Sequence, residues 1–204
     1  MNNNNLTLKN NIYFNKKINS FHKLNKKFDK IYINLKREIK NKNKTLNILD
    51  DKFKFNFRLR ELSKYKKFNT IVIIGMGGSI LGANAIYDFF RSTIKKKVYF
   101  FDDLDENKFS SLKKKEYLPK ILFIIISKSG NTIEVLSIIK AIKSKAKFNE
   151  KNSLIITENK KSHLSLFANK YNIRIIFHRK YIGGRYSIFS ETALVPCYLM
   201  GINV

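Results

Sequence analysis

The chain has 204 residues, 44 % of them hydrophobic, which is enough for one ordinary domain with an added segment. Its net charge of +26 would fit a nucleic-acid partner, but it comes from 34 Lys and only 7 Arg, beside 28 Ile, 24 Asn and 17 Phe with similarly A/T-rich codons. We therefore interpret the charge as codon drift and expect no nucleic-acid partner. One cysteine, no signal-peptide pattern and apolar runs too short for a membrane helix predict a cytoplasmic protein without a membrane partner.

Residues 1–69 are predicted to form a helical appendage that is rich in lysine and asparagine. Apolar side chains recur in it at helical spacing: Phe21, Leu24, Phe28, Ile31 and Leu35. A second short helix is expected within residues 51–69. The composition changes at residue 70, so residues 70–204 are predicted to form the main domain.

Short apolar runs alternate with longer amphipathic segments from residue 70 onward. The predicted strands are residues 70–75, 98–101, 121–126, 153–157 and 173–177, and the predicted helices are 80–94, 132–147 and 162–171. This alternation indicates an α/β domain with a parallel sheet and helices on both faces. Such sheets bind ligands beyond the carboxyl ends of their strands, where the polar loops of this sequence fall.

The first of these loops is GMGGSILGA, residues 75–83. Gly75, Gly77 and Gly78 follow a predicted strand and precede a predicted helix. Glycines let the backbone approach a ligand closely, and a helix N-terminus favours an anion. The alternative interpretation is a turn whose glycines serve only close packing.

A dinucleotide-binding loop is a further interpretation of the same residues. The G-x-G-x-x-G pattern begins correctly, but Ile80 stands where the third glycine is required. Asp102 and Asp103 end the next predicted strand, where a ribose-binding acid would lie. The match is therefore partial, and a Walker A loop is excluded because no G-K-[ST] follows.

The second loop begins at the end of the run ILFIII and reads SKSGNTIE, residues 127–134. Ser127, Ser129 and Thr132 offer hydroxyl groups, and the following helix exposes its first backbone N–H groups. Hydroxyls together with successive N–H groups can hold a phosphate. The alternative is an ordinary polar turn between a strand and a helix.

The start of that helix carries a capping-box pattern. We expect Asn131 to cap it, with Glu134 three residues later as the partner. Lys128 either adds positive charge to the loop or faces solvent.

The third stretch is YIGGRYSIFSETALVP, residues 181–196. Arg185 follows two glycines and precedes a helical pattern. A cation is disfavoured at a helix N-terminus, so its presence there suggests another purpose, such as stabilising a developing oxyanion. The alternative is a surface arginine at the start of a helix.

These three stretches, in this order, resemble the N-terminal half of the glucose-6-phosphate isomerase family, over roughly residues 70–204. The first two are also similar to the wider sugar-isomerase (SIS) superfamily, whereas the arginine stretch is more specific to the isomerases. The resemblance implies a three-layer αβα sandwich around a five-stranded parallel sheet. It also implies the interconversion of glucose 6-phosphate and fructose 6-phosphate, a step of glycolysis and gluconeogenesis, without a cofactor or metal.

The resemblance further implies roles for individual residues. It places the sugar phosphate on the loop formed by Ser127, Lys128, Ser129, Gly130, Asn131 and Thr132. Gly78 and Ser79 would contact the sugar. Arg185 would be catalytic and would stabilise the enediolate intermediate.

The chain departs from the family because family members carry a second SIS domain, which holds the general-base glutamate, the ring-opening histidine and a late lysine. No other acid or histidine persuades us as a base, whether Glu134, Glu158, Glu191, His163 or His178. We therefore expect an N-terminal part of an isomerase that is inactive alone and pairs in a homodimer or with a missing C-terminal half. The alternative is a sugar-phosphate binding or regulatory SIS module without turnover.

Overall fold

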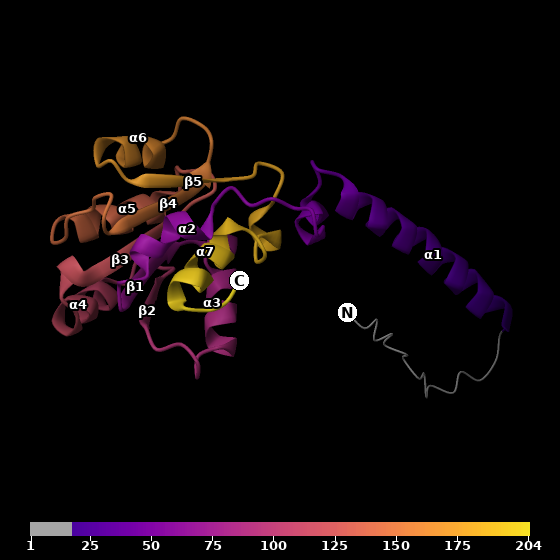
Figure 1. Cartoon of the computed structure of the whole chain (residues 1–204), viewed down its shortest axis with the longest axis horizontal. Helices are drawn as coiled ribbons and strands as arrows, with labels where there is room; N and C mark the ends of the chain where they lie inside the picture. The colour runs from indigo at the N-terminus through magenta and orange to yellow at the C-terminus, as the bar shows by residue number, and fades with distance from the viewer. Residues whose placement is uncertain (1–17) are drawn as a thin grey trace.

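The computed structural model of the chain describes residues 18–204, and it is shown in Figure 1. A long helix, α1 (Ile18–Lys40), leads into an irregular segment and then into an α/β domain. The helical start that the sequence predicted is thus confirmed. Residues 1–17 lie outside the described part, as does the side chain of Phe21.

Five parallel strands form the single sheet of the domain. They are β1 (Thr70–Gly75), β2 (Lys97–Phe101), β3 (Ile121–Ile126), β4 (Ser153–Glu158) and β5 (Arg174–His178), in the spatial order β2-β1-β3-β4-β5. Each strand lies within a residue or two of its predicted position. The prediction of a parallel α/β sheet is confirmed.

Helices cover both faces of this sheet, so the domain is a three-layer αβα sandwich. They are α2 (Leu59–Leu62), α3 (Leu81–Phe89), α4 (Glu106–Lys115), α5 (Ile133–Lys143), α6 (His163–Lys170) and α7 (Glu191–Met200). Apolar residues of α4, α5 and α6 pack on one face, and those of α2 and α7 pack on the other, with α3 beside α7. Because both faces are covered, every residue of the three inner strands β1, β3 and β4 is buried, and β3 is apolar throughout.

Helix α4 is an element that the apolar pattern did not predict. Its sequence, ENKFSSLKKK, offers only Phe109 and Leu112 as large apolar residues. The helix begins because the side chain of Asp105 accepts a hydrogen bond from the N–H of Asn107, an N-cap that fixes its first turn.

The segment before β1 contributes to the core of the domain. Leu62 and Tyr65 are fully buried, and Phe68 is nearly so, against the face of the sheet that α7 also covers. The phenol hydroxyl of Tyr65 donates a hydrogen bond of 3.0 Å to the carbonyl of Glu150. The boundary at residue 70 remains a prediction, but part of the predicted appendage belongs to the packed body.

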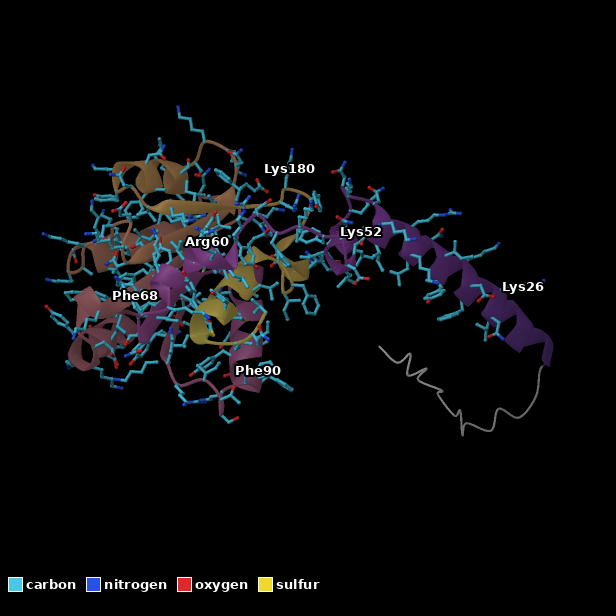
Figure 2. The ribbon with its side chains drawn as sticks, in the orientation of Figure 1. Lys26, Lys52, Arg60, Phe68, Phe90 and Lys180 are labelled. Atoms are coloured by element: carbon cyan, nitrogen blue, oxygen red, sulfur yellow. The ribbon has the colours of Figure 1, made fainter. Side chains whose placement is uncertain are left out.

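Helix α1 stands away from the sheet, and its side chains project on all sides in Figure 2, where Lys26 marks its outer part. Its apolar stripe is open: Leu24 and Phe28 are each 63 % exposed and Ile31 is 60 % exposed. Within residues 24–204, therefore, no side chains cover this face. None of the helices in the described range is long and apolar enough to cross a membrane.

The central strand gives a direct test of the fold. We expect Ile124→Ala to lower the free energy of unfolding by about 2–5 kcal/mol, because the side chain is fully buried in the core beneath α2 and α7. Ile133→Ala on α5 is the matched control, since Ile133 is 72 % exposed and should change stability by less than about 0.5 kcal/mol. Urea unfolding measures both, and equal effects would contradict the layer assignment.

Candidate functional site

Three loops leave the carboxyl edge of the sheet: residues 76–80 after β1, 127–132 after β3 and 179–190 after β5. They are called here the glycine loop, the hydroxyl loop and the arginine loop. Strand β5 lies three positions from β1 in the sheet. The arginine loop nevertheless reaches back to the glycine loop, so all three meet over the ends of β1, β3 and β4.

Hydroxyl groups converge within the hydroxyl loop. The Oγ atom of Ser127 lies 2.9 Å from Oγ1 of Thr132, and Oγ of Ser129 lies 3.3 Å from the same atom. The N–H of Gly130 donates to Ser127 Oγ at 3.1 Å. Ser127 is almost fully buried, so the cluster has a rigid base at the end of β3.

Backbone N–H groups of the same loop are available to a ligand. In the hydrogen-bond network of the described residues, the N–H groups of Lys128, Ser129 and Thr132 have no acceptor. The first turn of α5 follows at once, and the leading N–H groups of a helix lack partners within the helix. Open donors beside three hydroxyls form a site suited to an anion such as a phosphate.

The expected capping box on α5 is wrong. Thr132 holds the N-cap position and makes no side-chain cap hydrogen bond. The Oδ1 atom of Asn131 instead accepts a hydrogen bond of 2.9 Å from the backbone N–H of His163. The same atom lies 3.0 Å from Nδ1 of the His163 ring. The start of α6, distant in sequence, thus takes the side chain that a local pattern assigned to α5.

Gly130 is required by its backbone. Its φ of 68° lies in the left-handed region, and an added Cβ would come within 2.2 Å of the Ser162 hydroxyl. The N–H of Leu164 also donates to the Gly130 carbonyl at 3.0 Å. The hydroxyl loop is therefore held against the first turn of α6.

The glycine loop and the arginine loop touch through their backbones. A Cβ added to Gly78 would lie 2.3 Å from the carbonyl carbon of Gly184 and 2.8 Å from the N atom of Arg185. The hydroxyl of Ser187 donates to the Gly78 carbonyl at 3.0 Å. Close packing alone therefore explains the glycine at position 78, whereas Ser79, in the same 3₁₀ turn, is half-buried beside this contact.

Arg185 lies in a 3₁₀ turn, Gly184–Tyr186, well before α7 begins. The argument that it occupies a helix N-terminus is therefore wrong, because Ser190 caps α7 and Glu191 is its first residue. The Arg185 side chain is exposed and makes no hydrogen bond or ion pair with any residue in the described part of the chain. A guanidinium without an internal partner can bind an anionic ligand.

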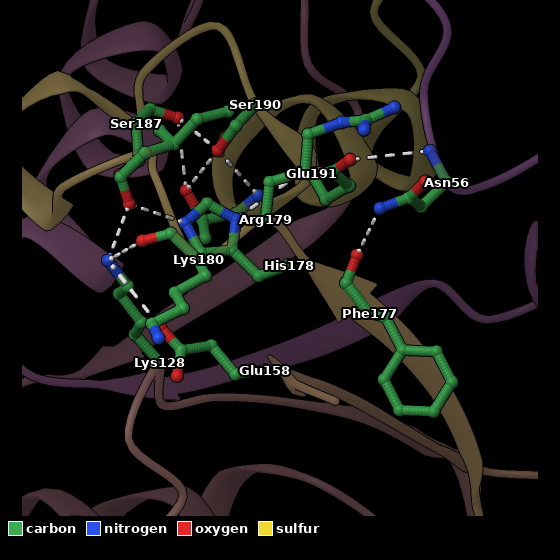
Figure 3. Close-up of polar contacts among 12 residues, drawn as sticks. Asn56, Lys128, Glu158, Phe177, His178, Arg179, Lys180, Ser187, Ser190 and Glu191 are labelled. Carbon is green, nitrogen blue, oxygen red and sulfur yellow. Dashed lines mark hydrogen bonds and ion pairs between the residues drawn. The ribbon is translucent and has the colours of Figure 1, made fainter. Parts of the chain in front are cut away.

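Lys128 connects the hydroxyl loop to the arginine loop. Its Nζ donates to the carbonyls of Lys180 at 2.8 Å and Ile182 at 2.9 Å, and it lies 3.6 Å from Oε1 of Glu158 (Figure 3). Its ammonium group is therefore engaged by the arginine loop and Glu158, although the side chain remains 29 % exposed.

Glu158 ends β4 between these two loops and also pairs with Lys160 at 2.8 Å. Its burial raises the pKa of the carboxyl, but the hydrogen bond and charge of Lys160 and the charge of Lys128 outweigh burial and hold the pKa below its ordinary value. Sequence reasoning considered Glu158 only as a base, whereas the structure uses it as a structural anion.

Four other acids and histidines considered from the sequence make ion pairs or hydrogen bonds with other side chains. Glu191 and His178 are buried and face each other, with 3.3 Å between Oε2 and Nδ1. Asp102 and Asp103 both accept from Nζ of Lys108, at 2.8 and 2.7 Å, as an ion-pair cluster at the end of β2. Across the described residues, no group of three or more His, Cys, Asp and Glu side chains is placed to hold a metal ion.

A separate cavity of about 970 Å³ opens at the opposite, amino edge of the sheet, where Thr70 and Glu116 lie in its lining. None of its lining residues belongs to the three loops. The cavity is therefore separate from the candidate site that the three loops form at the carboxyl edge.

Comparison with known proteins matches residues 22–203 to the phosphoglucose isomerase family. The chain is 37 % identical to a glucose-6-phosphate isomerase of Methanocaldococcus jannaschii, over 70 % of this chain and 36 % of that protein. It is 30 % identical to the Campylobacter jejuni glucose-6-phosphate isomerase, over 78 % of this chain and 39 % of that protein. The crystal structure of a Chlamydia trachomatis glucose-6-phosphate isomerase superposes with a TM-score of 0.60 at 25 % identity, covering 71 % of this chain and 29 % of that one. The chain thus spans less than half the length of these relatives.

The contact between the two glycine-bearing loops can be tested by adding a single methyl group. Gly78→Ala should destabilise the fold by about 1–3 kcal/mol, because the Cβ would overlap the Gly184 backbone. Gly183→Ala is the control: its φ is −70° and its Cβ would meet only Tyr186 at 3.5 Å, so stability should hold or rise slightly. Thermal unfolding compares them, and a harmless Gly78→Ala would contradict the loop contact.

The lowered pKa of Glu158 predicts a pH dependence of stability. Its carboxylate stabilises the folded state above the ordinary pKa of 4.5, and this contribution is lost as pH falls through the lower folded-state pKa. Glu158→Gln should therefore be less stable than wild type near pH 7, and the difference should shrink below about pH 4. Urea unfolding across this range measures it, and a difference that grew on acidification would have the wrong sign.

Proposed function

Because the chain belongs to the phosphoglucose isomerase family, we propose that it forms the sugar-phosphate-binding part of a glucose-6-phosphate isomerase. The observation that carries the proposal is the hydroxyl loop. Three hydroxyls converge there beside the open N–H groups of Lys128, Ser129 and Thr132. Such a loop can bind the phosphate of a hexose 6-phosphate through many short donors.

The phosphate binds over the hydroxyl loop, and the sugar extends toward the glycine loop. Ser127, Ser129 and Thr132 donate from their hydroxyls, while Gly130 and Asn131 hold the loop in shape. Lys128 adds positive charge from the side, although its donors are directed at the arginine loop. Gly78 and Ser79 contact the sugar.

The reaction is an aldose–ketose isomerisation through ring opening and an enediol. A proton moves between C1 and C2, and negative charge develops on oxygen when the first C–H bond breaks. Arg185, exposed and without an internal partner, stabilises this oxyanion electrostatically. Glucose 6-phosphate and fructose 6-phosphate are isomers, so the step has no net redox change and needs no redox cofactor.

The proton transfer also needs a general base, and the two buried glutamates beside the three loops are both engaged. Glu158 is held by two lysines, and the carboxylate of Glu191 is buried against His178. We therefore propose that this chain alone binds the sugar phosphate in the cytoplasm without turnover. A C-terminal half of an isomerase supplies the base. The open apolar stripe of α1 supports an apolar partner surface, whether on that half or on a second copy of this chain.

A sugar-phosphate binding or regulatory module is the second candidate function, and the engagement of Glu158 by lysines and of Glu191 by His178 favours it. The two candidates share the ligand and differ in chemistry. Both candidates predict that the isolated chain binds glucose 6-phosphate without converting it. Phosphorus NMR of glucose 6-phosphate, followed over time in the presence of the chain, tests this. Growth of a fructose 6-phosphate signal would contradict the proposal that the isolated chain only binds.

Substitution at Thr132 tests the phosphate site. Thr132→Val removes the hydroxyl on which two serines converge, and we expect glucose 6-phosphate affinity to fall about tenfold or more, as for a lost hydrogen bond to a charged group. Thr132→Ser keeps the hydroxyl and should change affinity by less than about threefold. Calorimetric titration measures both. Equal affinities for wild type and Thr132→Val would place the ligand elsewhere.

A further inference from the structure

The carbonyl of Ile182, in the arginine loop, receives two polar groups from different parts of the chain. Lys128 Nζ donates to it at 2.9 Å, and Nε2 of His178 lies 3.1 Å from it. Ile182 itself is fully buried. This carbonyl therefore fixes the arginine loop three residues before Arg185.

The geometry of His178 determines how its protons are placed. Both ring nitrogens face oxygen atoms: Nε2 faces the Ile182 carbonyl, and Nδ1 faces Oε2 of Glu191 at 3.3 Å. A carbonyl can only accept, so Nε2 carries a proton. One further proton lies between Nδ1 and the Glu191 carboxyl, so the pair is either an imidazolium with a carboxylate or a neutral imidazole with a carboxylic acid.

The pair is almost completely buried, with side-chain exposures of 1 % for His178 and 0 % for Glu191. Glu191 also accepts at Oε1 from the N–H of Asn56 at 3.3 Å, so its second oxygen is used as well. Glu158 is the neighbour of His178 across the β4–β5 register. Lys128, Glu158, His178 and Glu191 thus form a continuous polar layer under the arginine loop, which Figure 3 shows.

Stability alone does not account for this layer. A buried ion pair commonly adds little net stability over apolar side chains of the same size. What the pair does provide is directional hydrogen bonding to one loop carbonyl, and that loop carries an exposed arginine without an internal partner.

We propose that His178, oriented by Glu191, is a positioning residue for Arg185, and that Lys128 joins it in holding the arginine loop to the hydroxyl loop. The proposal rests on the proposed function, because it assigns the layer to the site that binds the sugar phosphate. A sugar phosphate whose phosphate sits on the hydroxyl loop then presents its sugar to an arginine already held in place, which avoids the cost of ordering the loop at binding.

Hydrogen exchange tests the positioning without any ligand. The N–H groups of Ile182, Tyr186 and Ser187 are hydrogen-bonded within the arginine loop and report its opening. His178→Leu and, separately, Lys128→Met should each lower the protection of these three N–H groups by about tenfold or more. The protection of Ser127, whose N–H bonds to β4 in the core, should stay unchanged.

Two variants serve as matched controls. Glu191→Gln can donate to His178 Nδ1 while accepting from Asn56, so every bond persists without charge, and loop protection should stay within about twofold of wild type. Lys160→Met removes the other lysine of Glu158 without touching the arginine loop and should likewise leave it unchanged. Unchanged loop protection in both His178→Leu and Lys128→Met would overturn the proposal. So would an equal loss of protection in loop and core, which would mark a general loss of stability.

Ligand titrations test whether the position of the arginine loop affects sugar-phosphate binding. Titration of wild type and His178→Leu with inorganic phosphate and with glucose 6-phosphate should show unchanged phosphate affinity but an approximately tenfold loss for the sugar phosphate. Equal glucose 6-phosphate affinities would overturn the role of His178 in positioning Arg185. If wild type binds neither ligand, the proposed function fails for this chain, whereas the exchange data still decide whether the layer holds the loop.

Discussion

The backbone contact between Gly78 and Gly184 is the constraint on which the site depends. Strands β1 and β5 are three positions apart in the sheet, which corresponds to roughly 14 Å between their ends. The arginine loop has to cross the ends of β4 and β3 to reach the glycine loop. It can close that gap only because Gly78 carries no Cβ at the crossing point. Lys128, just after β3, holds the arginine loop through two of its carbonyls, and Glu158, at the end of β4, pairs with Lys128.

The inner strands β1, β3 and β4 were predictable because they are buried on both faces. Runs such as ILFIII have no polar position, and their ends coincide with the observed strands to within a residue or two. Helix α4 was missed for the opposite reason, since its surface is almost wholly polar and its start depends on one aspartate cap. Local patterns thus predict elements that bury much apolar surface and miss those that bury little.

The sequence indicated the three loops of the candidate site, but it did not predict the hydrogen bonds and ion pairs between their side chains. The capping box at Asn131 and Glu134 was plausible locally, but the start of α6 competes for Asn131 through the fold. The pairing of His178 with Glu191 joins the end of β5 to the start of α7. A sequence shows each residue type but not which of its possible partners the tertiary packing brings within reach. The few acidic residues of this basic chain are therefore easily mistaken for catalytic groups, although Glu158 and Glu191 hold loops.

The most direct test of the account is the mapping of amide ¹H–¹⁵N shifts as glucose 6-phosphate is added to the folded chain. The account predicts shifts at the N–H groups of Lys128, Ser129 and Thr132 and in the arginine loop around Arg185, because these line the carboxyl edge of the sheet. Glucose without phosphate should leave the hydroxyl loop unshifted. Shifts confined to the lysine-lined cavity at the amino edge, or none at all, would contradict the claim that the three loops form a sugar-phosphate site.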